Sequence, residues 1–209
     1  MSIVALCGLA GSGKGTCGDI LQEYHFVKMS FADSLKDAVS SIFGWNRDLL
    51  EGDTVESRNF REIVDPFWSN KFGRDITPRI ILQEIGTDLF RDKFLDSIWI
   101  DSLERKLSKY DDVVICDVRF PNEIEFLASV GAKIIEVSRP EIEPEWVEII
   151  KYNTKNSSKY FDRGVFMSLH HPEVHPSEFL WVGNKFINNV IINDGSKKDL
   201  IEKLLKTIY

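Results

Sequence analysis

Short β-branched segments alternate with longer amphipathic segments along most of this chain. The short runs suit buried parallel strands, and the longer segments carry apolar residues at the three- and four-residue spacing of helices. This alternation predicts βαβ units, and therefore an α/β fold in which helices flank a parallel sheet on both faces. The expected strands are residues 2–7, 113–116, 133–137 and 190–192, and the expected helices are residues 15–24, 34–43, 78–90, 97–110, 122–130 and 196–208.

Two segments interrupt the alternation. Residues 44–77 combine aromatic side chains with many charges, and residues 140–186 hold three of the four histidines without a strong period. A length of 209 residues suits one domain with a sizeable core. We therefore expect a single domain over residues 1–209, with these two segments inserted over a ligand cleft.

Composition limits the partners that this chain can take. A net charge of -7 argues against a general nucleic-acid surface, which needs a face rich in lysine and arginine. We find neither a secretory leader nor an apolar run long enough to cross a bilayer, so no membrane partner is expected. Three cysteines without metal-ligand spacing predict the reduced thiols of a cytoplasmic protein. The negative net charge is compatible with binding of a small anionic ligand, because a local cluster of donors can hold phosphate in an acidic protein.

A glycine-rich loop follows the first expected strand. Residues 8–16 read GLAGSGKGT and lead into the first expected helix. In such a P-loop, backbone N–H groups and the helix N-terminus surround a phosphate, while the lysine, here Lys14, reaches the β- and γ-phosphates. The sequence therefore predicts a P-loop NTPase fold whose nucleotide phosphates contact Gly11, Ser12, Gly13, Lys14, Gly15 and Thr16.

The end of this loop departs from the commonest pattern. Gly15 stands where most P-loops carry the magnesium-binding serine or threonine, and the hydroxyl comes one residue later, in Thr16. Lys-Gly-Thr in this frame resembles adenylate kinase and its nucleotide-kinase relatives, in which magnesium is held largely through phosphates and water. Thr16 is therefore interpreted as an α-phosphate contact rather than a metal ligand.

An acid and an arginine follow the second expected strand. Asp117 comes directly after the apolar run at residues 113–116, and Arg119 follows two residues later. Ligands of open α/β sheets bind at the carboxyl ends of the strands, so we expect Asp117 to orient magnesium-bound water and Arg119 to point the same way. The alternatives are a turn or capping aspartate before Pro121 and a solvated surface arginine.

The expected helix at residues 78–90 has one polar face. Thr77 and Pro78 make a good helix start, and an arginine, an amide and a glycine on the polar face would let a planar ligand approach closely. A solvated surface is the alternative. The polar face carries Arg79, Gln83, Gly86 or Thr87, and Arg91, and the apolar face, expected to pack on the core, carries Ile81, Leu82, Ile85 and Leu89.

These motifs, in this order, resemble those of the deoxynucleoside monophosphate kinases of tailed bacteriophages. The resemblance spans nearly the whole chain, and the P-loop is its most specific part. It rests on residues 8–16, on FADSLK at 31–36, RIILQEIGTD at 79–88, DVRFPNE at 117–123, SRP at 138–140, HPSE at 175–178 and NDGS at 193–196.

The resemblance implies an adenylate-kinase-like fold with nucleotide-monophosphate-binding and lid insertions. It implies transfer of a phosphoryl group from ATP or dATP, with Mg²⁺, to the 5′-phosphate of a nucleoside monophosphate, as in DNA precursor synthesis. It also implies a homodimer and a cytoplasmic location, in the host cytoplasm for a phage gene. The resemblance places Lys36, Arg79 and Gln83 at the acceptor, and Asn193 and Gly195 near the donor adenine. Thr87, Asp88 and Arg91 are added to the acceptor contacts, and the motifs together predict Lys14, Arg79, Asp117 and Arg119 as the catalytic residues.

The residue types fit this chemistry. An acceptor phosphate is already anionic, so positioning and charge neutralisation suffice, and arginines should matter more than acids. Arg139 and Arg163 are further candidates, whereas His170, His171 and His175 lack metal-ligand spacing and suit a lid or loop.

Two other functions stay open. In a hydroxyl-acceptor P-loop kinase, such as dephospho-coenzyme A kinase, Asp33 would be the general base. In a nucleotide-binding module or regulatory ATPase, no small acceptor would exist.

Overall fold

The structure is a computed structural model that describes residues 2–156 and 161–209. The chain forms two compact units. The sheet unit comprises Met1–Ser30 and Leu107–Tyr209, and the helical unit comprises Phe31–Lys106. The insertion expected at residues 44–77 therefore lies inside a larger compact unit, and that expected at residues 140–186 belongs to the sheet unit.

A parallel sheet forms the centre of the sheet unit. Within the described residues it has five strands in the order β2-β3-β1-β4-β5, all parallel, which confirms the predicted fold class. The central strand pairs on both sides, with Val4 opposite Val114 in one ladder and Ala5 opposite Ile134 in the other. The strands are β1 (Ser2–Cys7), β2 (Val27–Met29), β3 (Asp112–Ile115), β4 (Lys133–Ser138) and β5 (Asn189–Ile192).

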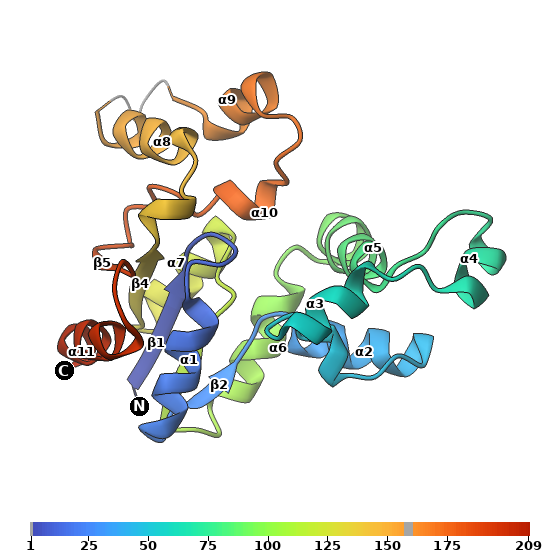
Figure 1. The fold of residues 1–209 in the computed structure, drawn as a ribbon, viewed down its shortest axis with the longest axis horizontal. Coiled ribbons are helices and arrows are strands. Elements are labelled where there is room, and N and C mark those ends of the chain that lie inside the picture. Colours follow the sequence, from blue (N-terminus) through green and yellow to red (C-terminus); the bar gives the residue numbers. More distant parts are fainter. Residues whose placement is uncertain (1, 157–160) are drawn as a thin grey trace. The chain divides into compact units, whose positions relative to one another are not determined.

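Helices cover both faces of this sheet (Figure 1). On one face, α1 (Lys14–Glu23) and α11 (Lys197–Ile208) pack their apolar stripes on the strands and on each other. The connection from β1 to β2 crosses the sheet in one direction, and the connection from β3 to β4 crosses it in the other. Right-handed crossovers therefore place α7 (Pro121–Ser129) on the face opposite α1. The core between the strands and the first two helices includes Ile20, Leu21, Leu200 and Leu204.

The expected insertion at residues 140–186 is largely helical. Its long helix buries Trp146, Val147 and Ile150, and Lys151 forms a 2.6 Å ion pair with the buried Glu136 of β4. This pair ties the helix to the sheet. The segment contains η3 (Pro140–Ile142), α8 (Glu145–Asn156), α9 (Arg163–His170) and α10 (Pro176–Phe179).

Aromatic residues of the segment at residues 44–77 pack against Phe43 in the helical unit. Phe43 stacks on Trp45 at a centroid distance of 4.8 Å and contacts Trp68 at 4.7 Å. The indole of Trp45 donates a 2.7 Å hydrogen bond to Asp65, which also caps the helix that follows it. The unit contains α2 (Asp33–Phe43), η1 (Asp48–Leu50), α3 (Val55–Glu62), α4 (Pro66–Phe72), α5 (Pro78–Gln83), η2 (Glu84–Phe94) and α6 (Ile98–Leu107, which ends one residue beyond the unit).

The helix expected at residues 78–90 changes its winding after one and a half turns. Thr77 caps α5 as expected, but from Glu84 the chain continues as a π-helix, η2. Because i→i+5 hydrogen bonds widen each turn, the residues that follow rotate away from their α-helical positions. The predicted apolar face is therefore wrong at Leu89, which is 51% exposed, while Arg91 is buried.

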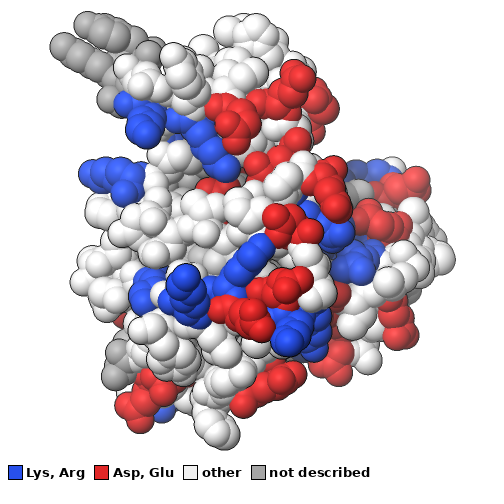
Figure 2. All heavy atoms as spheres, turned by 60° about the vertical axis from the view of Figure 1, so that its left-hand side comes forward, with Lys and Arg blue, Asp and Glu red and all other residues white. Residues whose placement is uncertain are grey.

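Charged side chains of both signs interleave on the face seen in Figure 2. Among the residues described, no helix combines the length and the apolar character that a bilayer crossing requires.

Candidate functional site

The loop between β1 and α1 has the backbone geometry of an anion cradle. Gly8, Gly11 and Gly13 have φ angles of +144°, +82° and +109°, which side chains disfavour. At Gly8 a Cβ would also lie 2.3 Å from the carbonyl oxygen of Val137. The loop thus folds tightly against the end of β4, and α1 begins at Lys14 with its N-terminal N–H groups toward the loop.

Lys14 folds back over this loop. Its ammonium donates hydrogen bonds of 2.7 Å to the carbonyl oxygens of both Gly8 and Leu9. Burial, together with the positive charge of Arg119, lowers the pKa of Lys14 to about 8. The structure therefore places a cation of lowered pKa at the loop, while the predicted Ser12 is buried, Gly15 half-buried and Thr16 exposed.

The lowered pKa predicts that nucleotide binding takes up a proton above pH 8. Phosphate oxygens beside Lys14 favour its charged form and should raise its pKa on binding. A nucleotide whose own second phosphate pKa is about 6 releases no proton there. Calorimetry at pH 8.5 in buffers of different ionisation enthalpy should show uptake of a fraction of one proton, and affinity should fall as pH rises from 8 to 9.5.

The Lys14→Met variant provides the control for this experiment. It should bind more weakly and show no proton uptake at pH 8.5. Equal uptake by the variant and the parent chain would assign the proton to another group.

Asp117 lies just beyond β3, at the carboxyl edge of the sheet. Its Oδ2 accepts a 2.5 Å hydrogen bond from Ser30, which follows β2. No group of three or more His, Cys, Asp or Glu side chains in the described residues could hold a metal ion. A single carboxylate still fits Mg²⁺, which keeps several waters and is commonly bound by one or two carboxylates plus substrate phosphates.

Arg119 is held by the HPSE segment. Its Nη1 donates to Glu178 at 2.5 Å and to Ser177 at 3.3 Å, and its backbone N–H donates to the buried Glu123. His175 Nδ1 lies 2.8 Å from the Ser177 hydroxyl. The sequence indicated Arg119 but not these partners, although their segment belongs to the resemblance.

The two further arginines in the sheet unit differ in the groups they contact. Arg139 is half-buried and pairs with Glu141 at 3.2 Å. Arg163 donates from Nη1 to the carbonyl oxygens of Leu180 and Val182, at 2.6 and 2.7 Å. These bonds give Arg163 a structural role between α9 and the segment after α10.

Lys36, expected at the acceptor, is buried in the helical unit. Its Nζ donates a 2.5 Å hydrogen bond to Glu51, which also pairs with Arg47. Burial tends to raise the pKa of Glu51, but the two cations together hold it below its ordinary value. Lys36 therefore already holds a carboxylate.

Arg79 also holds a carboxylate. Its Nε donates to Glu62 on α3, and both side chains are about half exposed. Farther along, Gln83 and Asp88 are exposed, Thr87 is half-buried and Arg91 is buried. The helical unit thus carries all the predicted acceptor residues on α2, α5 and η2, and the sheet unit carries the predicted donor residues.

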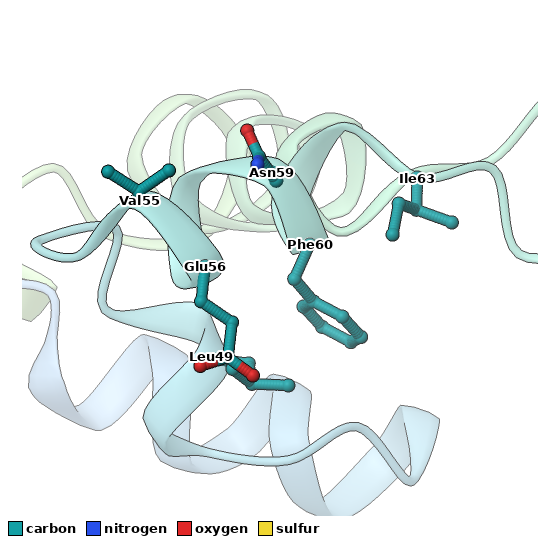
Figure 3. Close-up of a pocket in the computed structure, with 6 residues that line it drawn as sticks. All are labelled: Leu49, Val55, Glu56, Asn59, Phe60 and Ile63. Atoms are coloured by element: carbon teal, nitrogen blue, oxygen red, sulfur yellow. The ribbon is translucent and has the colours of Figure 1, made fainter.

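A largely apolar groove of about 580 Å³ lies beside α3 in the helical unit. Figure 3 shows the side chains of Glu56 and Phe60 projecting toward the side on which Leu49 lies. None of the predicted site residues lines it. Its lining consists of Leu49, Val55, Glu56, Asn59, Phe60 and Ile63.

Comparison with known proteins gives one consistent family. A family model described as deoxynucleotide monophosphate kinase matches residues 46–150. A protein of Acanthamoeba polyphaga mimivirus, provisionally named a deoxynucleotide monophosphate kinase, is 35% identical over 158 residues, covering 68% of this chain and 76% of that protein. The deoxynucleoside-5′-monophosphate kinase of Escherichia phage T5 is 52% identical over 54 residues, covering 25% of this chain and 22% of that protein.

Among solved structures, the Thermus thermophilus protein TT1252 aligns over 99% of this chain and 95% of its own, with a TM-score of 0.49 and 20% identity.

Proposed function

Because the chain belongs to the deoxynucleotide monophosphate kinase family and is therefore a phosphotransferase, we propose that it transfers the γ-phosphoryl group of ATP to the 5′-phosphate of a deoxynucleoside monophosphate. The product would be the diphosphate, a precursor for DNA synthesis. dATP is an alternative donor. Membership of the family rests on the match of residues 46–150, and the ATP donor is inferred from the P-loop.

The P-loop is the observation that carries the donor assignment. Three glycines at positive φ turn the loop, and a lysine follows at the first position of α1. We assign the donor phosphates to the loop backbone, Lys14 and Thr16. Lys14 and Arg119 then neutralise charge on the transferred group, which is the main requirement of phosphoryl transfer.

The acceptor is assigned to the helical unit. Arg79 and Lys36 offer cations for its phosphate, and Gln83, Thr87, Asp88 and Arg91 offer polar groups for the rest of the nucleotide. A phosphate acceptor needs no general base, so no residue is given that role.

Magnesium belongs to the same proposal. Asp117 would hold it through water, at the edge of the sheet where the P-loop also lies. When bound, the ion neutralises charge on the β- and γ-phosphates. The homodimer and the cytoplasmic location implied by the resemblance are likewise proposals, and measurement of the molecular mass in solution tests the first.

A phosphate acceptor predicts that Asp33→Asn changes kcat by less than about threefold. Asp33 lies 3.4 Å from Arg47 and is partly exposed, and such exposed pairs contribute about 0–1 kcal/mol. Steady-state kinetics with a deoxynucleoside monophosphate measure the effect. If Asp33 were the base of a hydroxyl-acceptor kinase, the same variant would lose several orders of magnitude.

One assay tests the proposed function directly. The protein is incubated with Mg²⁺-ATP alone and with each of the four common deoxynucleoside monophosphates, and ADP and deoxynucleoside diphosphate are quantified by chromatography. Equal amounts of both products, formed only with an acceptor, are expected. ATP consumption that no monophosphate stimulates would contradict the proposal and favour an ATPase or binding module.

A further inference from the structure

We infer that Asn193 is a positioning residue that fixes the shape of the P-loop. The resemblance placed Asn193 near the donor adenine, which would make it a reader of the base. The contacts of its amide point to the phosphates instead. This inference rests on the proposed function only in taking the loop to bind phosphate.

Asn193 is fixed at the end of β5 and reaches the loop with its side chain. Its backbone N–H donates a 2.7 Å hydrogen bond to the carbonyl oxygen of Ser138, at the end of β4. Its side-chain Nδ2 donates a 2.9 Å hydrogen bond to the carbonyl oxygen of Ser12. Asn193 therefore connects the loop after β1 to the ends of β4 and β5, across 181 residues of sequence.

The loop backbone lies directly against this amide. Gly13 has a φ of +109°, and a Cβ at Gly13 would lie 2.5 Å from Asn193 Nδ2. Glycine is therefore needed here both for the backbone angle and for the close approach. Because Nδ2 already donates to the Ser12 carbonyl oxygen, the amide of Asn193 is engaged by the loop rather than directed toward a nucleotide base.

The hydrogen bond to Ser12 also determines where the next N–H points. The Ser12–Gly13 peptide is planar and trans, so its C=O and N–H point in opposite directions. With the oxygen held by Asn193, the Gly13 N–H must point away from the β5 end. Because P-loops bind phosphate through such N–H groups, Asn193 would keep one donor oriented before the nucleotide arrives.

A lysine of α11 holds the segment that carries Asn193. Lys203 donates from Nζ to the carbonyl oxygen of Ile192 at 2.8 Å and to Asp194 at 2.6 Å. These two residues flank Asn193 in the chain, so its backbone is fixed on both sides. Lys203 should therefore influence the loop only through Asn193.

The test compares a ligand that has a base with one that lacks it. We would measure the affinity of the parent chain, Asn193→Ala and Asn193→Asp for Mg²⁺-ATP and for Mg²⁺-tripolyphosphate by calorimetry. A positioning role predicts that Asn193→Ala lowers the affinity for both ligands by the same factor, roughly tenfold for one lost hydrogen bond. Asn193→Asp, which keeps the shape of the side chain but loses the donor, should bind both ligands no more tightly than Asn193→Ala does.

Three further measurements separate positioning from loss of structure. Asn188→Ala, an exposed asparagine just before β5, is the matched control and should bind both ligands like the parent. Lys203→Met should lower the affinity for both ligands by a factor that is smaller but again equal for the two. In turnover, Asn193→Ala should raise KM for ATP or lower kcat while leaving KM for the monophosphate unchanged, with an unaltered circular dichroism spectrum.

The outcomes also separate this inference from the proposed function. A loss confined to ATP, with tripolyphosphate binding unchanged, would identify Asn193 as a contact of the base and overturn the inference. Equal losses in a protein that phosphorylates no monophosphate would support the inference while contradicting the proposed function. A parent chain that binds neither ligand would overturn both.

Discussion

Lys14→Ala is expected to lower kcat by a factor on the order of 10³ without unfolding the protein. Lys14 is the cation that the P-loop places at the transferred phosphoryl group, where negative charge must be neutralised in the transition state. Its side chain can be removed without loss of a buried ion pair, because its ammonium donates to two carbonyl oxygens of the loop. Steady-state kinetics with saturating acceptor measure the loss.

Stability measurements complete this prediction. The lowered pKa of Lys14 means that its charge is less favourable in the folded chain than in the unfolded one. Lys14→Met, which keeps the aliphatic stem and removes the charge, should therefore show an unaltered or higher Tm at pH 7 together with the same loss of kcat. A folded Lys14→Met protein with near-normal turnover would exclude the P-loop as the donor site.

The sequence predicted the parts of the fold that are marked by an apolar run or by a regular period. Strands buried on both faces carry near-continuous apolar runs, as β1 and β3 do, and in β4 only Glu136 interrupts the run. β2 has only three residues, Val27–Met29, too few to show a period. In α9, the exposed Val165 and Leu169 disturb the amphipathic pattern, so this helix was not predicted.

The π-helix lies outside what a period of 3.6 residues can predict. Its position depends on packing, since Gly86 lies against Leu35 so closely that a Cβ there would be 2.6 Å from Leu35 Cδ2. Trp99 also donates to the Gly86 carbonyl oxygen at 2.9 Å. Contacts between residues this far apart in the chain leave no mark on a local pattern.

In the candidate site too, local features could be predicted from the sequence and contacts between distant residues could not. Spacing alone indicated the glycines and lysine of the P-loop, because their roles are local. The partners of the predicted cations come from elsewhere in the chain, as with Glu178 on Arg119, 59 residues away, and Glu62 on Arg79, 17 residues away. A sequence pattern that indicates each cation carries no information about which carboxylate it meets.

Arg79→Ala is expected to lower kcat/KM for the monophosphate by roughly 10²-fold. Two charge-assisted hydrogen bonds from one guanidinium to a phosphate contribute about 3 kcal/mol, and each 1.36 kcal/mol corresponds to a factor of about ten. Arg79→Lys keeps the charge but loses the two-pronged geometry, so it should lie between the parent and Arg79→Ala. KM for ATP should change little, because the donor phosphates are assigned to another element.

The carboxylate that Arg79 now holds makes this prediction specific. Glu62 and Arg79 are both about half exposed, so their pair adds little stability and a phosphate can replace the carboxylate. Glu62→Gln should therefore keep activity and, by removing the competing carboxylate, should lower KM for the monophosphate or leave it unchanged.

Arg74→Ala is the matched control, since Arg74 pairs with Glu84 in the same unit at 2.6 Å and has no assigned role. Equal losses in Arg74→Ala and Arg79→Ala, or a defect confined to ATP, would place the acceptor phosphate elsewhere. A defect confined to Arg79→Ala would instead mean that Glu62 occupies the position at which the acceptor phosphate binds Arg79. By the same reasoning, Glu51 would occupy the position of an anion that binds Lys36.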